Sequence, residues 1–282
     1  MIYLSTGLLK KKSTSSIVNN LENLKITNLE LSSGPYEKNI NNFLIKKKNK
    51  YKFNFLIHNY FPVPKKGFVL NLASKKTKIR TQSLILAKNA IKLSGKLGAK
   101  FYSFHAGFLI DPKITSLGKK IKEKLEITPR EIAKKNFIKS VNHLSNYARK
   151  YNVNLLIENN VLTKKNYFRF KSNPFLFVDE KEINDVMQIL PKNVKLLLDV
   201  GHLNVSAKTL KFNKINFINK CNKWINGYQL SENNGVEDEN KPIKSNSWFL
   251  KHIKKNKIYS LEIKLKNLIS AKEQIKILKK YV

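Results

Sequence analysis

The chain has 282 residues, 41% of them hydrophobic, and its 55 lysines and arginines outnumber 19 aspartates and glutamates to give a formal net charge of +36. This length permits one large domain with a sizeable core. The single cysteine, Cys221, excludes an internal disulfide and favours a reducing compartment. No stretch reaches the roughly 18 apolar residues that span a membrane, and the first residues lack a signal-peptide pattern, so we expect a cytoplasmic protein with no membrane partner.

Strand-like and helix-like segments alternate eight times along the chain. The expected strands are 1–6, 26–32, 53–59, 100–106, 153–159, 194–200, 225–231 and 258–264. Helical periodicity is clear in 79–97, 130–150 and 268–281. A helix after each of eight strands favours a closed barrel over an open doubly wound sheet, and the first turn, Thr6-Gly7-Leu8-Leu9, lacks a dinucleotide fingerprint. We therefore predict an α/β fold, a single (β/α)₈ TIM barrel over residues 1–282.

Three short apolar runs each end in a carboxylate. They end at Glu158, Asp199 and Glu262, and a fourth run carries Gln229 near its end. Because the carboxyl ends of parallel barrel strands meet at one mouth, we expect these side chains to converge there. Three buried acids and an amide are costly together unless a cation binds them. The alternative is that each acid only caps the helix that follows it.

Other polar residues are expected at the same mouth. Glu30, His58 and His105 stand at the ends of earlier strands, and His202 follows one turn after Asp199. The two histidines His58 and His105 either join the site, in substrate contact or metal ligation, or are ordinary hydrogen-bonded residues of strand ends. Two long loops, 59–74 and 232–246, are expected to lie over this mouth and build the pocket.

The oxygen-rich ligand set favours a hard divalent cation. The expected metal ligands are Glu158, Asp199, Gln229 and Glu262. Carboxylate and amide oxygens suit Mn²⁺ or Mg²⁺, with Zn²⁺ as the alternative, and four protein ligands leave positions open for adjacent oxygens of a substrate.

The basic excess predicts attraction to polyanions. Only four of the 55 basic residues are arginines, the usual readers of base edges: Arg80, Arg130, Arg149 and Arg169. The lysines are spread along the whole chain beside many asparagines and isoleucines, as AT-rich codons would produce. We expect nonspecific nucleic-acid binding at low salt.

Six motifs, in chain order, are similar to those of the xylose-isomerase-like barrel superfamily. They are Ile57-His58-Asn59-Tyr60-Phe61 with Asn71-Leu72-Ala73-Ser74, Phe104-His105-Ala106-Gly107, Leu156-Ile157-Glu158-Asn159, Leu198-Asp199-Val200-Gly201-His202, Asn233-Asn234-Gly235 with Asp238, and Leu261-Glu262-Ile263. That superfamily joins sugar and sugar-phosphate isomerases and epimerases with zinc-dependent AP endonucleases. The resemblance covers nearly the whole chain and implies the barrel fold.

The isomerase and epimerase branch implies one metal ion, held at the ends of strands five to eight. This chain matches that pattern except that Gln229 replaces a histidine. The two glutamates of such ketose epimerases also exchange the substrate proton, through an enediolate held by the metal. The resemblance therefore implies Glu158 and Glu262 as the acid–base pair. His202, with His58, His105 and Glu30, is expected to contact the substrate.

The endonuclease branch implies three zinc ions. Its first site corresponds to His58, His105 and Glu158, which are all present. Its second site needs a histidine where this chain has Gln229, and its third pairs His202 and Asp238 with a histidine where this chain has Asn240. Amides are poor zinc ligands next to imidazole, so the resemblance to this branch is incomplete.

The prediction from the sequence is a metal-dependent isomerase or epimerase acting on a sugar or sugar phosphate. One alternative is a metal-dependent AP endonuclease or other phosphodiesterase on DNA, and another is a non-catalytic barrel that binds a sugar or an anion. Metal content separates them, since they predict about one Mn-like ion, about three zinc ions, or none. Assembly into a homo-oligomer is compatible with the resemblance.

Overall fold

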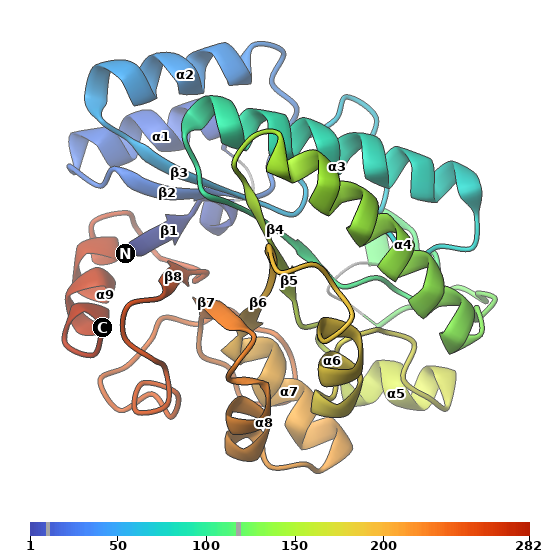
Figure 1. Cartoon of the computed structure of the whole chain (residues 1–282). Helices are drawn as coiled ribbons and strands as arrows, with labels where there is room; N and C mark the ends of the chain where they lie inside the picture. Colours follow the sequence, from blue (N-terminus) through green and yellow to red (C-terminus); the bar gives the residue numbers. More distant parts are fainter. Residues whose placement is uncertain (10–11, 117–119) are drawn as a thin grey trace.

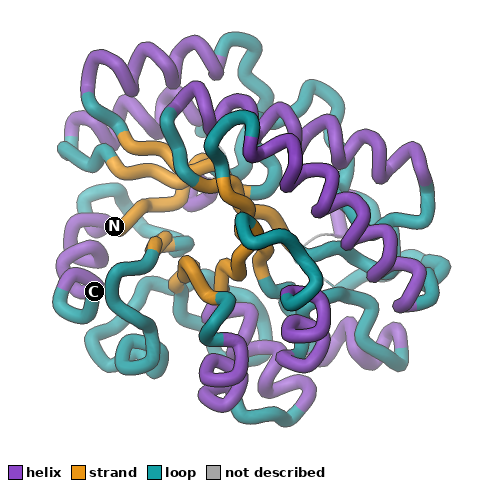
Figure 2. Tube along the Cα trace, in the orientation of Figure 1, coloured by secondary structure: helices purple, strands orange, loops and turns teal. Residues whose placement is uncertain are grey.

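The computed structural model describes residues 1–9, 12–116 and 120–282. Its eight strands pair in parallel in chain order, and β8 pairs with β1, so the sheet closes into a barrel. The strands form the centre of the molecule and the helices are packed around them (Figure 1; the same view coloured by secondary structure is Figure 2). The predicted (β/α)₈ barrel is confirmed.

The strands begin and end within a few residues of the expected ranges. They are β1 (Ile2–Ser5), β2 (Asn28–Leu31), β3 (Asn54–His58), β4 (Phe101–His105), β5 (Asn154–Glu158), β6 (Val194–Asp199), β7 (Ile225–Leu230) and β8 (Ile258–Leu261). Most of their residues are buried, because the barrel interior covers one face and the helices cover the other. This double burial explains the nearly continuous apolar runs in the sequence.

The α-helices of the described residues follow in the order α1 (Thr14–Asn23), α2 (Ile40–Tyr51), α3 (Thr77–Leu97), α4 (Arg130–Arg149), α5 (Lys164–Phe170), α6 (Glu180–Met187), α7 (Val200–Leu210), α8 (Lys214–Cys221) and α9 (Ser270–Lys279). Short 3₁₀ turns, η1 (Thr6–Leu9) and η2 (Ile114–Ser116), lie in the loops after β1 and β4. The helices expected from periodicity correspond to α3, α4 and α9. None of the described helices is long and apolar enough to cross a membrane.

The expectation of a helix after every strand is wrong between β7 and β8. Residues 231–257 form turns and one antiparallel bridge, Glu232 to Lys241, and contain no α-helix. The turn-forming run Asn233-Asn234-Gly235 explains the interruption, since Gly235 has a φ of +73° and Asn233 accepts the Gly235 amide proton. The connections from β5 to β6 and from β6 to β7 carry two helices each.

Gly107 sets the close approach of two loops at the barrel mouth. A Cβ at this position would lie 2.3 Å from the Cβ of Ala73 and 2.9 Å from its backbone nitrogen. Real Cβ atoms do not approach backbone so closely, so one of the two loops would have to move. Gly107 follows His105 by two residues, and this contact therefore also supports the position of that histidine.

We expect Gly107→Ala to destabilise the fold by about 1–3 kcal/mol, the usual cost of overpacking a filled site. Thermal unfolding followed by circular dichroism measures this. Gly7→Ala is the matched control, because its Cβ would meet only ordinary contacts of 3.5 Å or more. Equal melting temperatures for the two variants would contradict the prediction.

Candidate active site at the carboxyl ends of the strands

The predicted strand-end residues do meet at one mouth of the barrel. Glu158 is the last residue of β5, Asp199 is the last of β6, and His58 and His105 are the last of β3 and β4. Glu262 follows β8 directly. A cavity of about 200 Å³ opens here, and Glu262 lines it with His58, His105 and His202.

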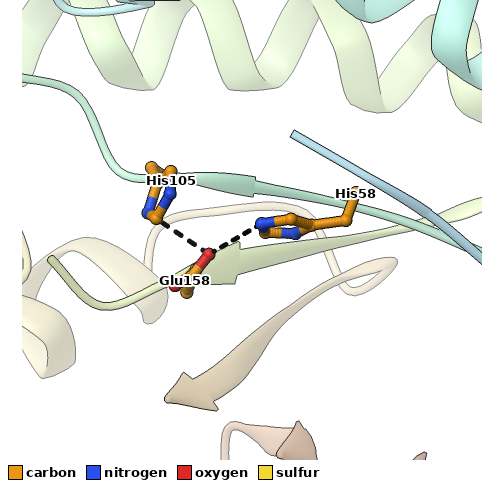
Figure 3. A group of neighbouring side chains, drawn as sticks. All are labelled: His58, His105 and Glu158. Carbon is orange, nitrogen blue, oxygen red and sulfur yellow. Dashed lines mark ion pairs between the residues drawn. The ribbon is translucent and has the colours of Figure 1, made fainter. Parts of the chain in front are cut away.

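Glu158 is the centre of the cluster. Its Oε2 lies 3.4 Å from His58 Nε2 and 3.2 Å from His105 Nδ1, and its Oε1 lies 3.0 Å from His202 Nδ1. Figure 3 shows the rings of His58 and His105 facing this carboxylate from neighbouring strands. Neither oxygen of Glu158 has a hydrogen-bond partner among the described residues, and the side chain is fully buried.

The imidazoles of His58 and His105 each point one ring nitrogen at Glu158. Burial lowers the pKa of His58 to about 3 and that of His105 well below its usual range, so both rings are neutral. His58 Nδ1 lies 3.0 Å from the Ser103 hydroxyl, which leaves Nε2 facing Glu158. A ring held by its other nitrogen in this way is oriented as metal-bound histidines are.

Asp199 and His202 form a second group on the other side of Glu158. Asp199 caps α7, because its Oδ1 accepts the backbone amide of His202 at 2.6 Å. The capping alternative is therefore correct for one oxygen of Asp199, while its Oδ2 is buried without a partner among the described residues. His202 Nδ1 donates to the carbonyl of Asn159 at 2.8 Å, and its Nε2 lies 3.4 Å from Asp238.

Asp238 lies beside His202, and its predicted role as a zinc ligand stays a prediction. Its Oδ2 also accepts from Asn240 Nδ2 at 3.5 Å, so Asn240 stands beside it as a hydrogen-bond donor. Burial alone would lower the pKa of His202, but Asp199 and Asp238 outweigh it and raise that pKa well above its usual range. In return, His202 outweighs burial at Asp238 and lowers the pKa of that carboxyl.

Gln229 is oriented by Glu30. Its Nε2 donates to Glu30 Oε1 at 3.2 Å, and its Oε1 is buried without a hydrogen-bond partner in the described part of the chain. This contact places the amide nitrogen of Gln229 toward Glu30 and leaves its amide oxygen free. Glu30 thus contacts Gln229, and its predicted contact with a substrate stays a prediction.

Two groups of side chains in the described residues bring potential ligand atoms within 4.8 Å of one another. They are His58 with His105 and Glu158, and Glu158 with Asp199 and His202. Glu158 belongs to both groups, whereas Glu262 belongs to neither. The predicted metal set of Glu158, Asp199, Gln229 and Glu262 stays a prediction.

The residues present fit a divalent cation. Burial, and to a smaller extent the neighbouring acids, raises the pKa of Glu158 to about 8. Burial raises the pKa of Asp199 to about 6, and burial together with the charge of Glu158 raises that of Glu262 well above its usual range. Buried carboxylates with unpartnered oxygens are expected to lose their protons readily when a cation binds between them. A site of oxygen ligands with two neutral imidazoles suits Mn²⁺ or Zn²⁺ better than Mg²⁺.

A pH dependence of stability follows from these raised pKa values. In the folded protein Glu158 has a pKa of about 8 and Glu30 has a pKa of about 7, whereas the usual value is near 4.5. At a pH between the usual value and these raised values, the folded protein holds protons that the unfolded chain has lost. The free energy of unfolding therefore falls as pH rises through this range. We expect the melting temperature of chelator-treated protein to fall between about pH 7 and about pH 8, where unfolded histidines are already mostly neutral.

Differential scanning calorimetry at several pH values measures this slope. Glu158→Gln should make the slope shallower, and saturating Mn²⁺ should flatten it. A melting temperature that rises across the same window in chelator would contradict the assignment of raised pKa values.

Asn159 has a supporting role that the sequence did not indicate. Its Oδ1 accepts the backbone amide of Asp199 at 2.8 Å, and its Nδ2 donates to the Asp199 carbonyl at 3.1 Å. This pair of bonds joins the ends of β5 and β6 and fixes Asp199 beside Glu158. The only signal in the sequence was a polar residue directly after a strand-end acid.

Comparison with known proteins shows the family. The profile of the xylose isomerase-like TIM barrel family matches residues 28–281, and the chain belongs to this family. An uncharacterized protein of Methanocaldococcus jannaschii, MJ1614, is 29% identical over 170 residues, which are 60% of this chain and 55% of that protein. The chain thus spans about half the length of this curated relative.

Solved structures agree on the fold. A D-tagatose 3-epimerase-like protein superposes with a TM-score of 0.74 at 18% identity, over 99% of this chain and 96% of that one. An L-ribulose 3-epimerase superposes with a TM-score of 0.66 at 14% identity, over 98% of this chain and 85% of that one. A Thermus thermophilus protein soaked with ZnCl₂ superposes with a TM-score of 0.64 at 14% identity, over 99% of this chain and 98% of that one. At these identities the likeness shows the barrel fold alone.

Proposed function

We propose that this protein is a divalent-metal-dependent isomerase or epimerase of a sugar or sugar phosphate. The observation that carries the proposal is the placement of two carboxylates at the barrel mouth: Glu262 lines the cavity, and the buried Glu158 contacts the three histidines that line it. The two carboxylates come from β5 and from the end of β8, three strands apart around the closed barrel. Carboxyls held partly protonated near neutral pH are suited to both donating and accepting a proton.

Each side chain has a defined task in this proposal. Glu158 and Asp199, with the free amide oxygen of Gln229, would hold the cation, and Glu262 would complete the set as its carboxylate ionises. The cation, when bound, supplies positive charge that acidifies the carbon-bound proton next to a sugar carbonyl. One glutamate removes that proton from one face of the sugar, and the other returns a proton from the opposite face. His202, protonated by its acidic neighbours, would donate to a substrate hydroxyl through Nε2, in place of its long 3.4 Å contact with Asp238.

Proton exchange tests this function without knowledge of the natural substrate. Protein loaded with Mn²⁺ is incubated in D₂O with D-tagatose, D-psicose and L-ribulose, the sugars named for the structural neighbours. Proton NMR then follows loss of the signal at the carbon beside the carbonyl. Exchange that requires both metal and protein supports the proposal. Absence of exchange across a broad panel of ketoses and their phosphates would contradict it.

A second candidate, a zinc-dependent endonuclease, is favoured by one specific observation. His58, His105 and Glu158 bring two neutral imidazoles and a carboxylate together, which is a ligand set that zinc prefers. Gln229 and Asn240 have amide side chains, which are poor zinc ligands next to imidazole. Both positions therefore disfavour the binding of further zinc ions. We therefore expect no incision of DNA, because cleavage of a phosphodiester needs ions that clamp both the attacking and the leaving oxygen.

Zinc-loaded protein and an abasic-site duplex test this expectation at moderate salt, beside Glu158→Gln. Incision by the native protein but not by this variant would establish the second candidate. The double variant Gln229→His, Asn240→His should bind additional zinc if these amides are the obstacle. Unchanged zinc content would mean that the assignment of these two positions is wrong.

DNA binding without cleavage is a separate expected result. The formal charge of +36 should hold duplex DNA at low salt, and affinity should fall steeply as salt rises because counterion release drives this binding. Fluorescence anisotropy of a labelled duplex between about 25 and about 200 mM salt measures the slope. Binding that is insensitive to salt would show that specific contacts, rather than the lysine excess, hold the DNA.

A further inference from the structure

A second cavity, of about 310 Å³, lies beside the catalytic cavity. It is formed by the loops after β4 and β5 and by the loop after β7, and its apolar wall consists of Phe108, Pro112, Ile121, Val161 and Phe175. Its volume lies at the lower end of the roughly 300–1,000 Å³ of small-molecule sites. Asp238 lines both cavities, so the two adjoin at the residue that holds His202.

Several polar side chains of this second cavity are already hydrogen-bonded within the protein. Asn160 Nδ2 donates to the carbonyls of Ala106 and Leu176 at 2.7 and 2.8 Å. Asn166 Oδ1 accepts the backbone amide of Ile121 at 3.0 Å, and the Thr163 hydroxyl accepts the amide of Asn166 at 3.3 Å. What these groups leave for an occupant is mainly apolar surface.

The catalytic cavity has the opposite character. Asp238 lines it, and Glu158 and Asp199 contact its lining residue His202. Both oxygens of Glu158, one oxygen of Asp199 and Oδ1 of Asp238 are buried without hydrogen-bond partners among the residues that the structure describes. A ligand that satisfies both cavities at once must therefore carry a polar part rich in hydroxyls and, within a few bonds of it, an apolar part. Asp238 Oδ1 stands at the junction, where it can accept a hydrogen bond from the polar part.

Several contacts hold the apolar wall together without a ligand. The Phe108 and Phe175 rings meet edge to face with centroids 5.6 Å apart. Arg130 holds this segment in place, because it donates to the carbonyl of Asn173 at 2.6 Å and pairs with Glu182 at 2.6 Å. A separate buried cluster that includes Ile121 and Phe175 supports the wall from behind. A preformed apolar pocket loses little entropy when it binds a flat ring.

We propose that this second cavity binds an apolar ring attached to the sugar, so that the substrate is a sugar conjugate rather than a free monosaccharide. The sugar half of this inference rests on the proposed function, and the ring half rests on the cavity alone. Two sources share the chemistry of an aromatic ring on a sugar, an aryl glycoside and a nucleoside. The ion pair of Lys165 and Glu237 spans the rim from α5 to the loop after β7 and places charge beside the entrance.

Binding measurements on the whole 282-residue chain loaded with Mn²⁺ test this cavity without any turnover. The first probe is 4-fluorophenol, followed by fluorine NMR, which reports on the ring site whatever the sugar is. The second set compares 4-nitrophenyl with methyl β-D-glucopyranoside, and adenosine with methyl β-D-ribofuranoside, by calorimetry. We expect the fluorophenol to bind and at least one ring-bearing sugar to bind about tenfold more tightly than its methyl counterpart. Which pair shows the preference identifies the source.

Filling the cavity provides the matched control. Val161→Trp places a large ring in the pocket and should weaken fluorophenol binding at least about tenfold. Ile189→Trp makes the same kind of change at a side chain that is 59% exposed and lines neither cavity, and it should bind as the native protein does. Phe108→Ala, which removes one ring of the wall, serves if Val161→Trp does not fold, and it should also weaken binding.

The inference is overturned if the native protein binds no fluorophenol, if it binds no ring-bearing sugar more tightly than the methyl form, or if binding survives in Val161→Trp. The outcome separates the two proposals. Exchange of a free ketose with no ring preference would leave the proposed function standing and remove the conjugate. A ring preference with no proton exchange on any sugar would leave the ring-binding cavity standing and contradict the proposed function.

Discussion

Replacing Glu262 by glutamine is expected to reduce sugar turnover by about 10²–10⁴-fold, the range that general acid–base catalysis contributes. Glutamine has the size and shape of glutamate but cannot take up or release a proton in the neutral pH range. Glu262 lines the cavity at the barrel mouth, and burial with the charge of Glu158 holds its pKa well above the usual range. The loss should appear in kcat, because the change removes a proton-transfer group rather than a surface for binding.

Proton exchange in D₂O and steady-state kinetics on the same ketose both measure this effect. Glu273→Gln is the matched control, since Glu273 is exposed on α9 and lies outside the site. Burying a neutral amide in place of an acid should leave the melting temperature equal or higher, which separates catalysis from folding. Normal turnover by Glu262→Gln would remove this residue from the mechanism.

Replacing Glu158 by glutamine is expected to lower metal affinity by more than about 10–100-fold, the loss that follows removal of an outer-shell partner alone. Glu158 is common to both groups of potential ligand atoms, and its two buried oxygens have no other partners among the described residues. The amide loses the negative charge that offsets a divalent ion. Asp199→Asn should act in the same direction, because the free oxygen of Asp199 is lost as an anionic ligand.

Elemental analysis of the purified variants, followed by titration with Mn²⁺ and Zn²⁺, measures occupancy directly. Glu131→Gln is the control, with a side chain 78% exposed on α4. Metal content at the native level in both Glu158→Gln and Asp199→Asn would show that the ion, if any, sits elsewhere. Loss in Glu158→Gln together with retention in Asp199→Asn would assign the ion to the group of His58 and His105.

The sequence alone determined the barrel and the positions of the polar residues along it. Runs such as Leu155-Leu156-Ile157 are apolar on both faces, and such runs form the parallel strands of a closed barrel because helices cover them outside and side chains fill them inside. A carboxylate or histidine at the last residue of such a strand must then lie at the barrel mouth. His58, His105, Glu158 and Asp199 followed from this rule, since it depends only on position within the strand.

Pairings across the mouth were decided only by the tertiary structure. The sequence could not show that Glu30 turns the amide of Gln229, that Asn159 binds both backbone groups of Asp199, or that Glu158 faces three imidazoles. Each pairing joins residues from 40 to 199 positions apart, and its geometry depends on strand register and side-chain rotamers, which no local pattern encodes.

The apolar cavity beside the site and the absence of a helix between β7 and β8 were likewise decided only by the tertiary structure. Loops such as 231–257 have no periodicity to read, because their backbone groups are satisfied by turns and by partners far along the chain. The sequence thus determined which residues reach the barrel mouth. The folded chain determined which of them touch, which polar atoms stay without partners, and what kind of ligand the neighbouring cavity can hold.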